Sequence, residues 1–511
     1  MILARRKLLR LGGAAALALP FAARAQMSMP QPAEPAPAPE PAPTPALAAP
    51  PPPAAEPAAD YTIRIGTGLV ELAPEVTVST KTYNGQFPGP LLRLTEGKRI
   101  TVDIHNDTDT PELLHWHGQF VPAEVDGAAE EGSPFVPPHG KQRVSFTPGP
   151  TGFRFYHSHV AAGADLSAGT YSGQAGPLYI EPRHEPGAYD REVFLTLKEF
   201  SPYLSRTEMP RDFLSPLATV PALREAAQKA AKDAASKGLP QGYEVAYDHF
   251  AINGRMLGFG EPVRVKTGER VLFHILNASA TEIRSLALPG HSFFVVALDG
   301  NPVPNPSDVP VLWLGTAERV SAIVAMNRPG IWVLGDLMDE DRSRGMGIVV
   351  EYANAKGKPR WTKPALSRWD YRLFAKAGSA VGAAPADEVI ELTIGTNPGS
   401  RNGFDEFTIN GVAFSMEKMQ PKFSLHRGKR YRLRMRNATD DVHPMHVHRH
   451  SFELTKIAGE PTAGVIKDVA MVGAYQEMEV DFTADQPGLS LFHCHMQSHM
   501  DFGLMALFDC A

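Results

Sequence analysis

The feature that most constrains the fold of this chain is a short pattern that occurs three times. Each copy has an Asn-Gly turn, then a Gly-x-Arg sequence that opens a strand, and an Asn that ends this strand. The copies lie at residues 83–107, 252–278 and 409–438. A supersecondary unit that recurs in this way indicates related domains, so the pattern predicts three domains of one kind.

Hydrophobic and polar residues alternate over short stretches of these domains, as in residues 99–104. A period of two residues, interrupted by Gly, Pro and Asn-Asp turns, is typical of β-sandwiches. We therefore predict an all-β chain of three sandwich domains. Their predicted bounds are 60–185, 190–353 and 386–511, with a linker over 354–385.

One helix is expected in the middle domain. Pro221 opens it, residues 222–237 are strong helix formers, and Gly238 stops it. The sequence assigns this helix no function.

The first 25 residues are expected to be an export signal. Arg5-Arg6-Lys7-Leu8-Leu9 has the twin-arginine pattern, residues 11–21 are apolar but too few to span a bilayer comfortably, and Ala23-Arg24-Ala25 suits cleavage. The twin-arginine pathway would deliver the folded protein to the periplasm. Residues 26–59 are almost all Pro and Ala, and we expect them to form an extended, disordered linker.

Composition narrows the classes of partner. The 511 residues include 56 acidic and 50 basic side chains, for a formal net charge of −6. Such a chain is a poor candidate for binding nucleic acid. We expect a monomer without a membrane span in the mature form. The two cysteines, Cys494 and Cys510, are too few for a disulfide scaffold, and both are expected to be reduced.

Ten of the 18 histidines fall into four short clusters. The clusters are His115-Trp116-His117, His157-Ser158-His159, His443-Pro444-Met445-His446-Val447-His448, and His493-Cys494-His495 with His499. At this frequency of histidine, chance would give roughly 0.6 His-x-His pairs in the whole chain. The clusters therefore indicate a function beyond core packing.

The spacing of the histidines indicates metal binding. In a strand, residues i and i+2 point to the same face, so each His-x-His pair offers two imidazoles side by side to one metal ion or to two adjacent ones. Eight imidazoles from two distant regions would meet if the first and third domains pack together. So many nitrogen ligands suggest a metal cluster, and copper stands at the top of the affinity order for such ligands.

Cys494 indicates a second kind of copper site. A thiolate with two histidines and a weak axial position is the blue-copper arrangement, and His443 and His499 are the natural partners. Within a strand, Cys494 faces away from His493 and His495. Its thiolate would then bind one copper ion while its two neighbours reach the cluster.

Together these motifs resemble those of three-domain multicopper oxidases, the family of the laccases, cuprous oxidases and bilirubin oxidases. The family patterns His-Trp-His-Gly, Tyr-His-Ser-His, His-Pro-x-His-x-His and His-Cys-His-x-x-x-His match residues 115–118, 156–159, 443–448 and 493–499. The resemblance runs from about Tyr61 to the C-terminus. It implies cupredoxin-like Greek-key domains, four copper ions, and oxidation of a small reductant coupled to reduction of dioxygen to water.

The resemblance also implies a role for each ligand. The type 1 copper would be bound by His443, Cys494 and His499, and the type 2 copper by His115 and His446. One type 3 copper would be bound by His117, His157 and His495, and the other by His159, His448 and His493.

The chain departs from the family pattern at two positions. Ten residues after Cys494, where many members carry an axial Met, it has Leu504. A non-coordinating Leu is expected to leave the type 1 copper three-coordinate and to raise its potential, and strand alternation would turn the adjacent Met505 away. Arg449-His450 stands where members often have Gly, and His450 is expected not to be a ligand.

Asp126 is the candidate proton donor for the reduction of dioxygen. It follows His117 in a segment that resembles the family segment carrying an acid below the cluster. The alternative is an ordinary Asp-Gly turn.

The reductant is less well defined than the acceptor. A phenolic, laccase-like donor at an exposed ring edge of His443 or His499 is the first hypothesis. Oxidation of metal ions such as Cu(I) is the second, although the 17 methionines are dispersed. Asp440 and Asp441 are expected either to form a turn or to attract a cationic or phenolic donor. A nitrite reductase would lack the His-Cys-His signature, and a non-catalytic scaffold would have lost ligands that are all present.

Overall fold

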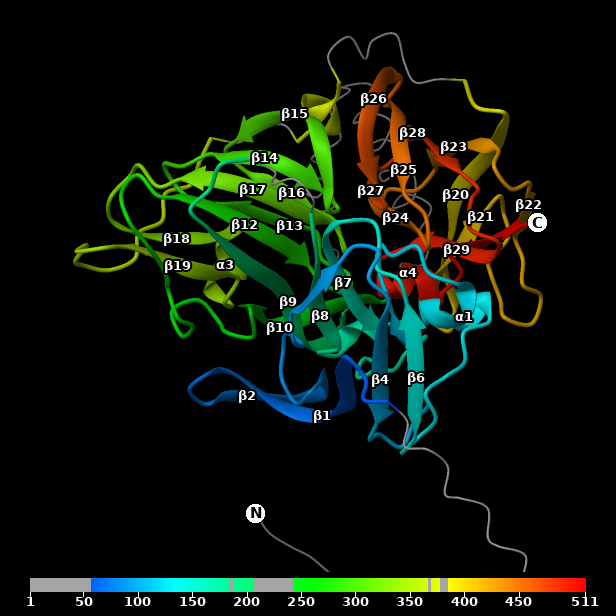
Figure 1. Cartoon of the computed structure of the whole chain (residues 1–511), viewed down its shortest axis with the longest axis horizontal. Helices are drawn as coiled ribbons and strands as arrows, with labels where there is room; N and C mark the ends of the chain where they lie inside the picture. The colour runs from blue at the N-terminus through cyan, green and yellow to red at the C-terminus, as the bar shows by residue number, and fades with distance from the viewer. Residues whose placement is uncertain (1–56, 183–186, 206–241, 366–368, 377–384) are drawn as a thin grey trace, which may run out of the picture. The chain divides into compact units, whose positions relative to one another are not determined.

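The computed structural model describes residues 57–182, 187–205, 242–365, 369–376 and 385–511. The predicted export signal, nearly all of the Pro/Ala segment and the predicted helix over 222–237 lie outside these ranges. The described residues form six β-sheets that pair into three sandwiches, with only short helices between strands (Figure 1). The predicted all-β fold of three sandwiches is confirmed.

The first sandwich pairs a sheet of order β2-β1-β4-β6 with a sheet of order β3-β8-β7-β5. The strands are β1 Tyr61–Ala73, β2 Val76–Tyr83, β3 Leu92–Thr95, β4 Ile100–Asn106, β5 Leu114–His115, β6 Lys141–Phe146, β7 Gly152–Ser158 and β8 Ala175–Glu181. The connections carry α1 Ala123–Asp126, η1 Ala129–Glu131 and η2 Gly169–Tyr171. Alternate residues fill the core, among them Ile63, Ile65 and Val102, which are at most 1% exposed.

The second sandwich pairs sheets of order β10-β9-β12-β17-β14-β15 and β11-β19-β18-β13-β16. The strands are β9 Arg191–Ser205, β10 Glu244–Ile252, β11 Val263–Val265, β12 Arg270–Asn277, β13 Arg284–Ala287, β14 Phe293–Leu298, β15 Asn301–Val309, β16 Leu312–Leu314, β17 Arg319–Ala325, β18 Ile331–Asp336 and β19 Gly347–Tyr352. The helix α3 covers Asp339–Ser343.

The third sandwich pairs sheets of order β21-β20-β23-β28-β25-β26 and β22-β30-β29-β24-β27. The strands are β20 Glu388–Arg401, β21 Phe404–Ile409, β22 Lys422–Leu425, β23 Arg430–Asn437, β24 His443–Val447, β25 Phe452–Ile457, β26 Glu460–Lys467, β27 Val469–Val472, β28 Glu477–Thr483, β29 Gly488–Cys494 and β30 Met505–Cys510. The helix α4 covers Gln497–Asp501.

The repeated sequence pattern makes the same turn in each sandwich. Asn84, Asn253 and Asn410 have φ of 54°, 53° and 53°, and the Gly after each also has positive φ, as a type I′ hairpin requires. Each Asn side chain accepts a hydrogen bond from a backbone N–H and donates one to a backbone carbonyl of the strand that opens its sandwich. The turn is therefore fixed to β1, β9 or β20 by the same pair of bonds.

The Asn that ends each copy of the pattern also has one role throughout. The Nδ2 groups of Asn106, Asn277 and Asn437 each donate to two or more backbone carbonyls farther along the chain. In the third sandwich one acceptor is the carbonyl of Asp441, at 2.7 Å. Asn437 thereby orders the loop that leads into His443.

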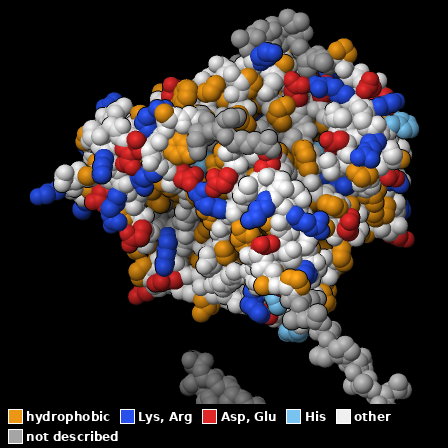
Figure 2. Space-filling model, viewed as in Figure 1, with side chains coloured by type: hydrophobic (Ala, Val, Ile, Leu, Met, Phe, Trp, Pro, Cys, Tyr) orange, Lys and Arg blue, Asp and Glu red, His pale blue; other side chains and the backbone are white. Residues whose placement is uncertain are grey.

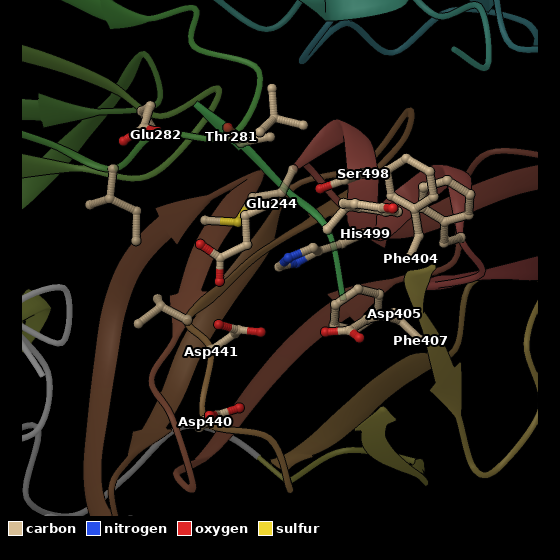
Figure 3. Close-up of a pocket in the computed structure, with 16 residues that line it drawn as sticks. Glu244, Thr281, Glu282, Phe404, Asp405, Phe407, Asp440, Asp441, Ser498 and His499 are labelled. Carbon is tan, nitrogen blue, oxygen red and sulfur yellow. The ribbon is translucent and has the colours of Figure 1, made fainter. Parts of the chain in front are cut away.

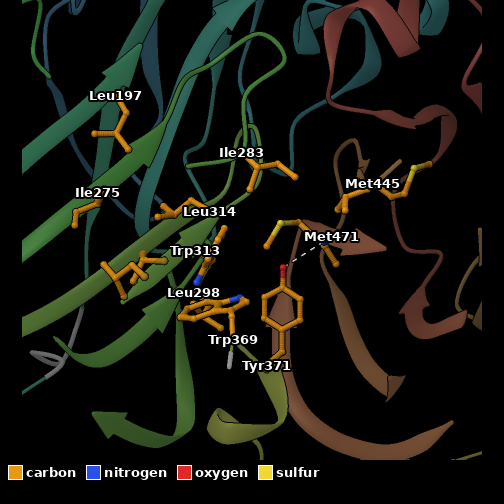
Figure 4. Packing of buried hydrophobic residues seen from close by; sticks show 14 of the residues in the cluster. Leu197, Ile275, Ile283, Leu298, Trp313, Leu314, Trp369, Tyr371, Met445 and Met471 are labelled. Atoms are coloured by element: carbon orange, nitrogen blue, oxygen red, sulfur yellow. Dashed lines mark hydrogen bonds between the residues drawn. The ribbon is translucent and has the colours of Figure 1, made fainter. Parts of the chain in front are cut away.

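Part of the predicted linker is built into the interior. The short helix η4 Tyr371–Phe374 lies between the second and third sandwiches (Figure 4), and Trp369, Tyr371 and Phe374 are at most 1% exposed. The Tyr371 hydroxyl donates to Glu318 Oε1 at 2.6 Å and accepts from Met471 N at 3.2 Å. This segment is therefore buried between the second and third sandwiches.

Acidic and basic side chains are interspersed on the face of the molecule shown in Figure 2. Ion pairs also form between strands of the third sandwich: Arg430 and Arg432 of β23 contact the buried Asp481, and Arg434 contacts Glu479. Within the ranges that the structure describes, no helix combines the length and the apolar character needed to cross a membrane.

Candidate metal centres

The strand register brings the histidine pairs together within each sandwich. His115 at the end of β5 lies opposite His157 on β7, and His446 on β24 lies opposite His493 on β29. The second histidine of every pair lies just beyond its strand, so the pairs stand at strand ends and not within strands as the spacing predicted. The rings of a pair still lie side by side, with centroids 4.9 Å apart for His446 and His448 and 5.5 Å for His493 and His495.

The first and third sandwiches meet at these strand ends, and the eight imidazoles form one group. The His115 ring stacks on His448 at 4.0 Å between centroids, and the His117 ring stacks on His446 at 3.8 Å. All eight residues are at most 5% exposed. We call these residues the histidine cluster: His115, His117, His157, His159, His446, His448, His493 and His495.

The protein satisfies one nitrogen of most of these rings, and the other nitrogen either has no partner or faces another ring of the cluster. The Nδ1–H groups of His115, His157, His446 and His493 are placed to donate to backbone carbonyls at 2.7 to 2.9 Å. The Nε2 atoms of His115 and His446 and the Nδ1 atom of His117 are buried without a hydrogen-bond partner. Orphaned nitrogens of this kind fit metal ligation, because a bound ion would satisfy them while the second nitrogen fixes the ring.

Burial also favours the neutral form, which a metal ligand requires, in seven of these rings. It lowers the pKa of His493 to about 3. It lowers the pKa values of His117, His157, His159, His446, His448 and His495 well below the usual range, with neighbouring rings adding to the effect. The Nε2 atoms of His448 and His493 lie only 3.0 Å apart, so these two ring nitrogens face the same small space between the rings.

A second group joins Cys494 to two histidines of the third sandwich. Its Sγ lies 3.7 Å from His443 Nδ1 and 3.5 Å from His499 Nδ1, and these two nitrogens are 3.0 Å apart. The Nε2–H of His443 is placed to donate to Thr439 Oγ1 at 2.7 Å, which leaves its Nδ1 facing the sulfur. One thiol and two imidazole nitrogens around a single point match the donor set of a blue-copper site.

Cys494 connects the two groups. Its thiol points toward His443 and His499, whereas the rings of His493 and His495 belong to the histidine cluster. Both thiols of the chain are free, and Cys510 is a separate buried thiol whose Sγ contacts the carbonyl of Ala484 at 3.6 Å.

Leu504 and Met505 pack in different places. Leu504 is fully buried in the hydrophobic cluster that contains Cys494, and its carbonyl accepts a hydrogen bond from Cys494 N at 3.1 Å. Met505 packs instead with Phe414, Leu491 and other residues of a separate cluster.

His450 does not join the histidine cluster. Its Nδ1–H is placed to donate to the His448 carbonyl at 3.0 Å, and its ring lines a different cavity beside Asp485.

Asp126 lies against the histidine cluster at the end of α1. It is fully buried, and its Oδ2 lies 2.9 Å from His448 Nδ1 and 3.3 Å from His115 Nδ1. The role of Asp126 as a proton donor stays a prediction, and these contacts place its carboxyl group within hydrogen-bond distance of the cluster.

Two further acids lie within 3.3 Å of rings of the histidine cluster, and the sequence reasoning missed both. Glu131 Oε1 lies 3.3 Å from His448 Nδ1 and accepts from Leu491 N at 2.6 Å. Burial, with Asp126 nearby, raises the pKa of Glu131 well above its usual range. Asp468 Oδ1 lies 3.1 Å from His117 Nε2. Neither acid has a sequence signal: Glu131 stands in an apparent acidic turn, and Asp468 is hundreds of residues from His117.

A cavity of about 120 Å³ opens beside the Cys494 group. Its wall includes His499, which is half-buried, whereas His443 is fully buried. Figure 3 shows Glu244, Asp405 and Asp441 around the space that the His499 ring faces. Phe404, Phe407 and Phe502 supply apolar wall, and Glu282 and Asp440 supply further carboxyl groups.

Fold and site together define a protein of three β-sandwiches with one Cys/His2 metal-binding group linked to one all-histidine group. Three family models described as multicopper oxidase match residues 65–185, 224–345 and 385–510. The chain belongs to the multicopper oxidase family, and it is an oxidoreductase that uses dioxygen.

Known relatives fall within the same family. Multicopper oxidase MmcO of Mycobacterium tuberculosis is 28% identical over 440 residues, which cover 84% of this chain and 83% of the relative. Laccase-4 of Thanatephorus cucumeris is 25% identical, covering 81% of this chain and 82% of the relative. The crystal structure of a multicopper oxidase from Pseudomonas thermotolerans has the same fold, with a TM-score of 0.64 and 24% identity over 89% of this chain and 100% of that one.

Proposed function

We propose that this chain oxidises a small reductant at a type 1 copper and reduces dioxygen to water at a trinuclear copper cluster. The observation that carries the proposal is the position of Cys494, whose thiol faces His443 and His499 while both of its neighbours point into the histidine cluster. Copper ions, when bound, would accept single electrons and carry out the four-electron reduction of dioxygen. The backbone of His493-Cys494-His495 gives a short covalent path between the two sites.

Each ligand takes a definite place in this proposal. His443, Cys494 and His499 hold the type 1 copper, and His115 and His446 hold the type 2 copper. His117, His157 and His495 hold one type 3 copper, and His159, His448 and His493 hold the other. The orphaned and converging nitrogens support these assignments.

Asp126 is proposed to supply protons for the reduction of dioxygen. It lies within hydrogen-bond distance of His448 and is closed off from solvent, so a proton held there can be delivered inside the site. Glu131 lies next to it, and burial raises the pKa of Glu131 well above its usual range, which favours the protonated carboxyl group from which Asp126 would be resupplied.

We propose a phenolic, laccase-like reductant that binds in the cavity beside His499. The aromatic wall of Phe404, Phe407 and Phe502 suits an aromatic ring, and the carboxyl groups can accept a hydrogen bond from a phenol or attract a cationic substituent. Oxidation of a metal ion is the second candidate. The carboxyl groups of the cavity favour it, as does 28% identity over 308 residues to copper resistance protein A of Pseudomonas syringae pv. tomato.

The charge of the cavity gives a test of the reductant. Asp441→Asn is expected to raise the KM of an aromatic donor that carries an ammonium group by about two- to five-fold, because a partly exposed carboxylate contributes up to about 1 kcal/mol of attraction. Oxygen uptake measures the effect, with a neutral phenol and Cu(I) as parallel donors.

Asp109→Asn, a change at an exposed acid of the first sandwich, is the control and should alter no KM. A rise in KM confined to Cu(I) would favour the metal-ion candidate. If Asp441→Asn has the wild-type KM for every donor, the placement of the donor in this cavity is contradicted.

Leu504 is proposed to occupy the axial position of the type 1 copper without binding it. Leu504→Met would offer a thioether ligand and is expected to lower the midpoint potential by at least about 60 mV, a tenfold change in the one-electron equilibrium. Redox titration of the blue absorption measures the shift. Leu507→Met on β30 is the control, because Leu507 packs in the separate cluster with Met505. An unchanged potential in Leu504→Met would refute the axial placement.

We also propose that the protein is exported to the periplasm by the twin-arginine pathway. Arg5 and Arg6 ahead of an apolar run support this, and cleavage is expected after Ala25. The amino-terminal sequence of the exported protein checks the cleavage point.

A further inference from the structure

Asp468 is placed between two rings of the histidine cluster that come from different sandwiches. It lies between β26 and β27 and is fully buried. The Nε2–H of His117 donates to Asp468 Oδ1 at 3.1 Å, and the Nδ1–H of His446 donates to the Asp468 carbonyl at 2.7 Å. These two rings stack with centroids 3.8 Å apart and planes inclined by 14°. One residue therefore holds both members of a stacked pair.

Two arginines fix the orientation of the Asp468 carboxylate. Arg319, on β17 of the second sandwich, donates through Nη1 to Oδ1 and through Nη2 to Oδ2, both at 2.6 Å. Arg154, on β7 of the first sandwich, donates through Nη1 to Oδ2 at 3.2 Å. Both arginines are fully buried. A bidentate guanidinium pair sets direction as well as distance, so this carboxylate has little freedom to turn.

The same contacts determine which nitrogen His117 offers to the cluster. With Nε2 committed to Asp468, the ring leaves Nδ1 facing the other histidines, and this atom is buried without a hydrogen-bond partner. The backbone after His117 passes very close to the carboxylate. Gly118 has φ +76°, and a Cβ there would lie 2.7 Å from Asp468 Oδ2 and 3.1 Å from Arg319 Nη2. Only glycine allows this approach.

We propose that Asp468, oriented by Arg319 and Arg154, is a positioning residue that directs Nδ1 of His117 and Nε2 of His446 toward the copper cluster. The inference rests on the proposed function. It has a structural consequence: the second sandwich, which supplies none of the proposed copper ligands, takes part in shaping the cluster through Arg319. Correct ligand geometry then depends on the docking of all three sandwiches.

The two copper sites allow an internal control. His443, Cys494 and His499 all belong to the third sandwich and lie against one another, so the blue absorption reports on the fold of that sandwich. In copper-loaded protein, Asp468→Asn is expected to weaken copper binding at the cluster by roughly ten- to a hundredfold. The type 2 signal in electron paramagnetic resonance should be lost or altered, while the blue absorption stays. Copper content and this spectrum are the readouts, independently of turnover.

Arg319→Lys is the second variant, in case Asp468→Asn fails to fold. It keeps the charge but removes the bidentate contact, and the type 2 signal should change with the blue absorption intact. Arg284→Lys is the matched control, because Arg284 is an equally buried arginine of the second sandwich that pairs with Asp341 at 2.7 Å.

The proposal is overturned if Arg319→Lys keeps the wild-type type 2 signal, or if Arg284→Lys changes that signal as much. Wild-type protein without a type 2 signal would instead count against the proposed function itself.

Discussion

Cys494→Ser is expected to abolish the blue absorption at about 600 nm and to reduce donor-dependent oxygen uptake to background, because a serine hydroxyl cannot replace the thiolate of a blue-copper site. Cys494 is fully buried, and its Sγ is within 3.7 Å of both His443 Nδ1 and His499 Nδ1. The histidine cluster lies on the other side of the strand, so its copper content should be retained. Absorption spectra, copper analysis and oxygen uptake on the same preparation measure these effects.

The chain supplies a matched control for this change. Cys510 is also a buried, free thiol of the third sandwich, but its Sγ contacts a backbone carbonyl and not a histidine ring. Cys510→Ser should keep the colour and the oxygen uptake. A Cys494→Ser protein that remains blue, or a Cys510→Ser protein that loses its colour, would show that the thiol of the type 1 site has been misassigned.

Asp126→Asn is expected to lower kcat for oxygen reduction by about a hundredfold, in the range that a positioned general acid contributes. The amide is nearly isosteric and can still contact His448, but it cannot release a proton. The blue absorption should be unchanged, because Asp126 lies against His448 and His115 and not against the Cys494 group. Steady-state oxygen uptake with saturating donor measures kcat.

Glu124→Gln is the control for the same helix, since Glu124 is an exposed acid two residues away on α1. It should have wild-type turnover. An Asp126→Asn enzyme with wild-type turnover would assign Asp126 a structural role only. Glu131→Gln should slow turnover less than Asp126→Asn if Glu131 acts by resupplying the proton.

The fold was predictable because its determinants are local and repeated. The Asn-Gly turns at Asn84, Asn253 and Asn410 make the same side-chain bonds to the backbone in every sandwich. One sequence pattern therefore corresponds to one turn structure. The histidine pairs could also be recognised in the sequence, because their determinant is local. Two imidazoles that must serve adjacent metal ions need a fixed short spacing, and this spacing leaves a signature in the sequence.

The rest of the site could not be predicted because it depends on contacts between distant segments. Asp468 and His117 are 351 residues apart, and Arg319 comes from a third sandwich. Single acids and arginines at such positions carry no spacing signal. The cavity beside His499 likewise combines Glu244 and Glu282 of the second sandwich with Asp441 of the third, and only Asp440 and Asp441 stood out through their position before His443.

We propose that two linked copper sites turn single-electron oxidations into a four-electron reduction of dioxygen. The most direct test is the ratio of donor oxidised to dioxygen consumed by the copper-loaded protein, measured with a one-electron phenolic donor in an oxygen electrode and a spectrophotometer together. We predict about four donor molecules oxidised per dioxygen, with no hydrogen peroxide released. A ratio of about two with accumulation of peroxide would contradict four-electron reduction at the linked sites.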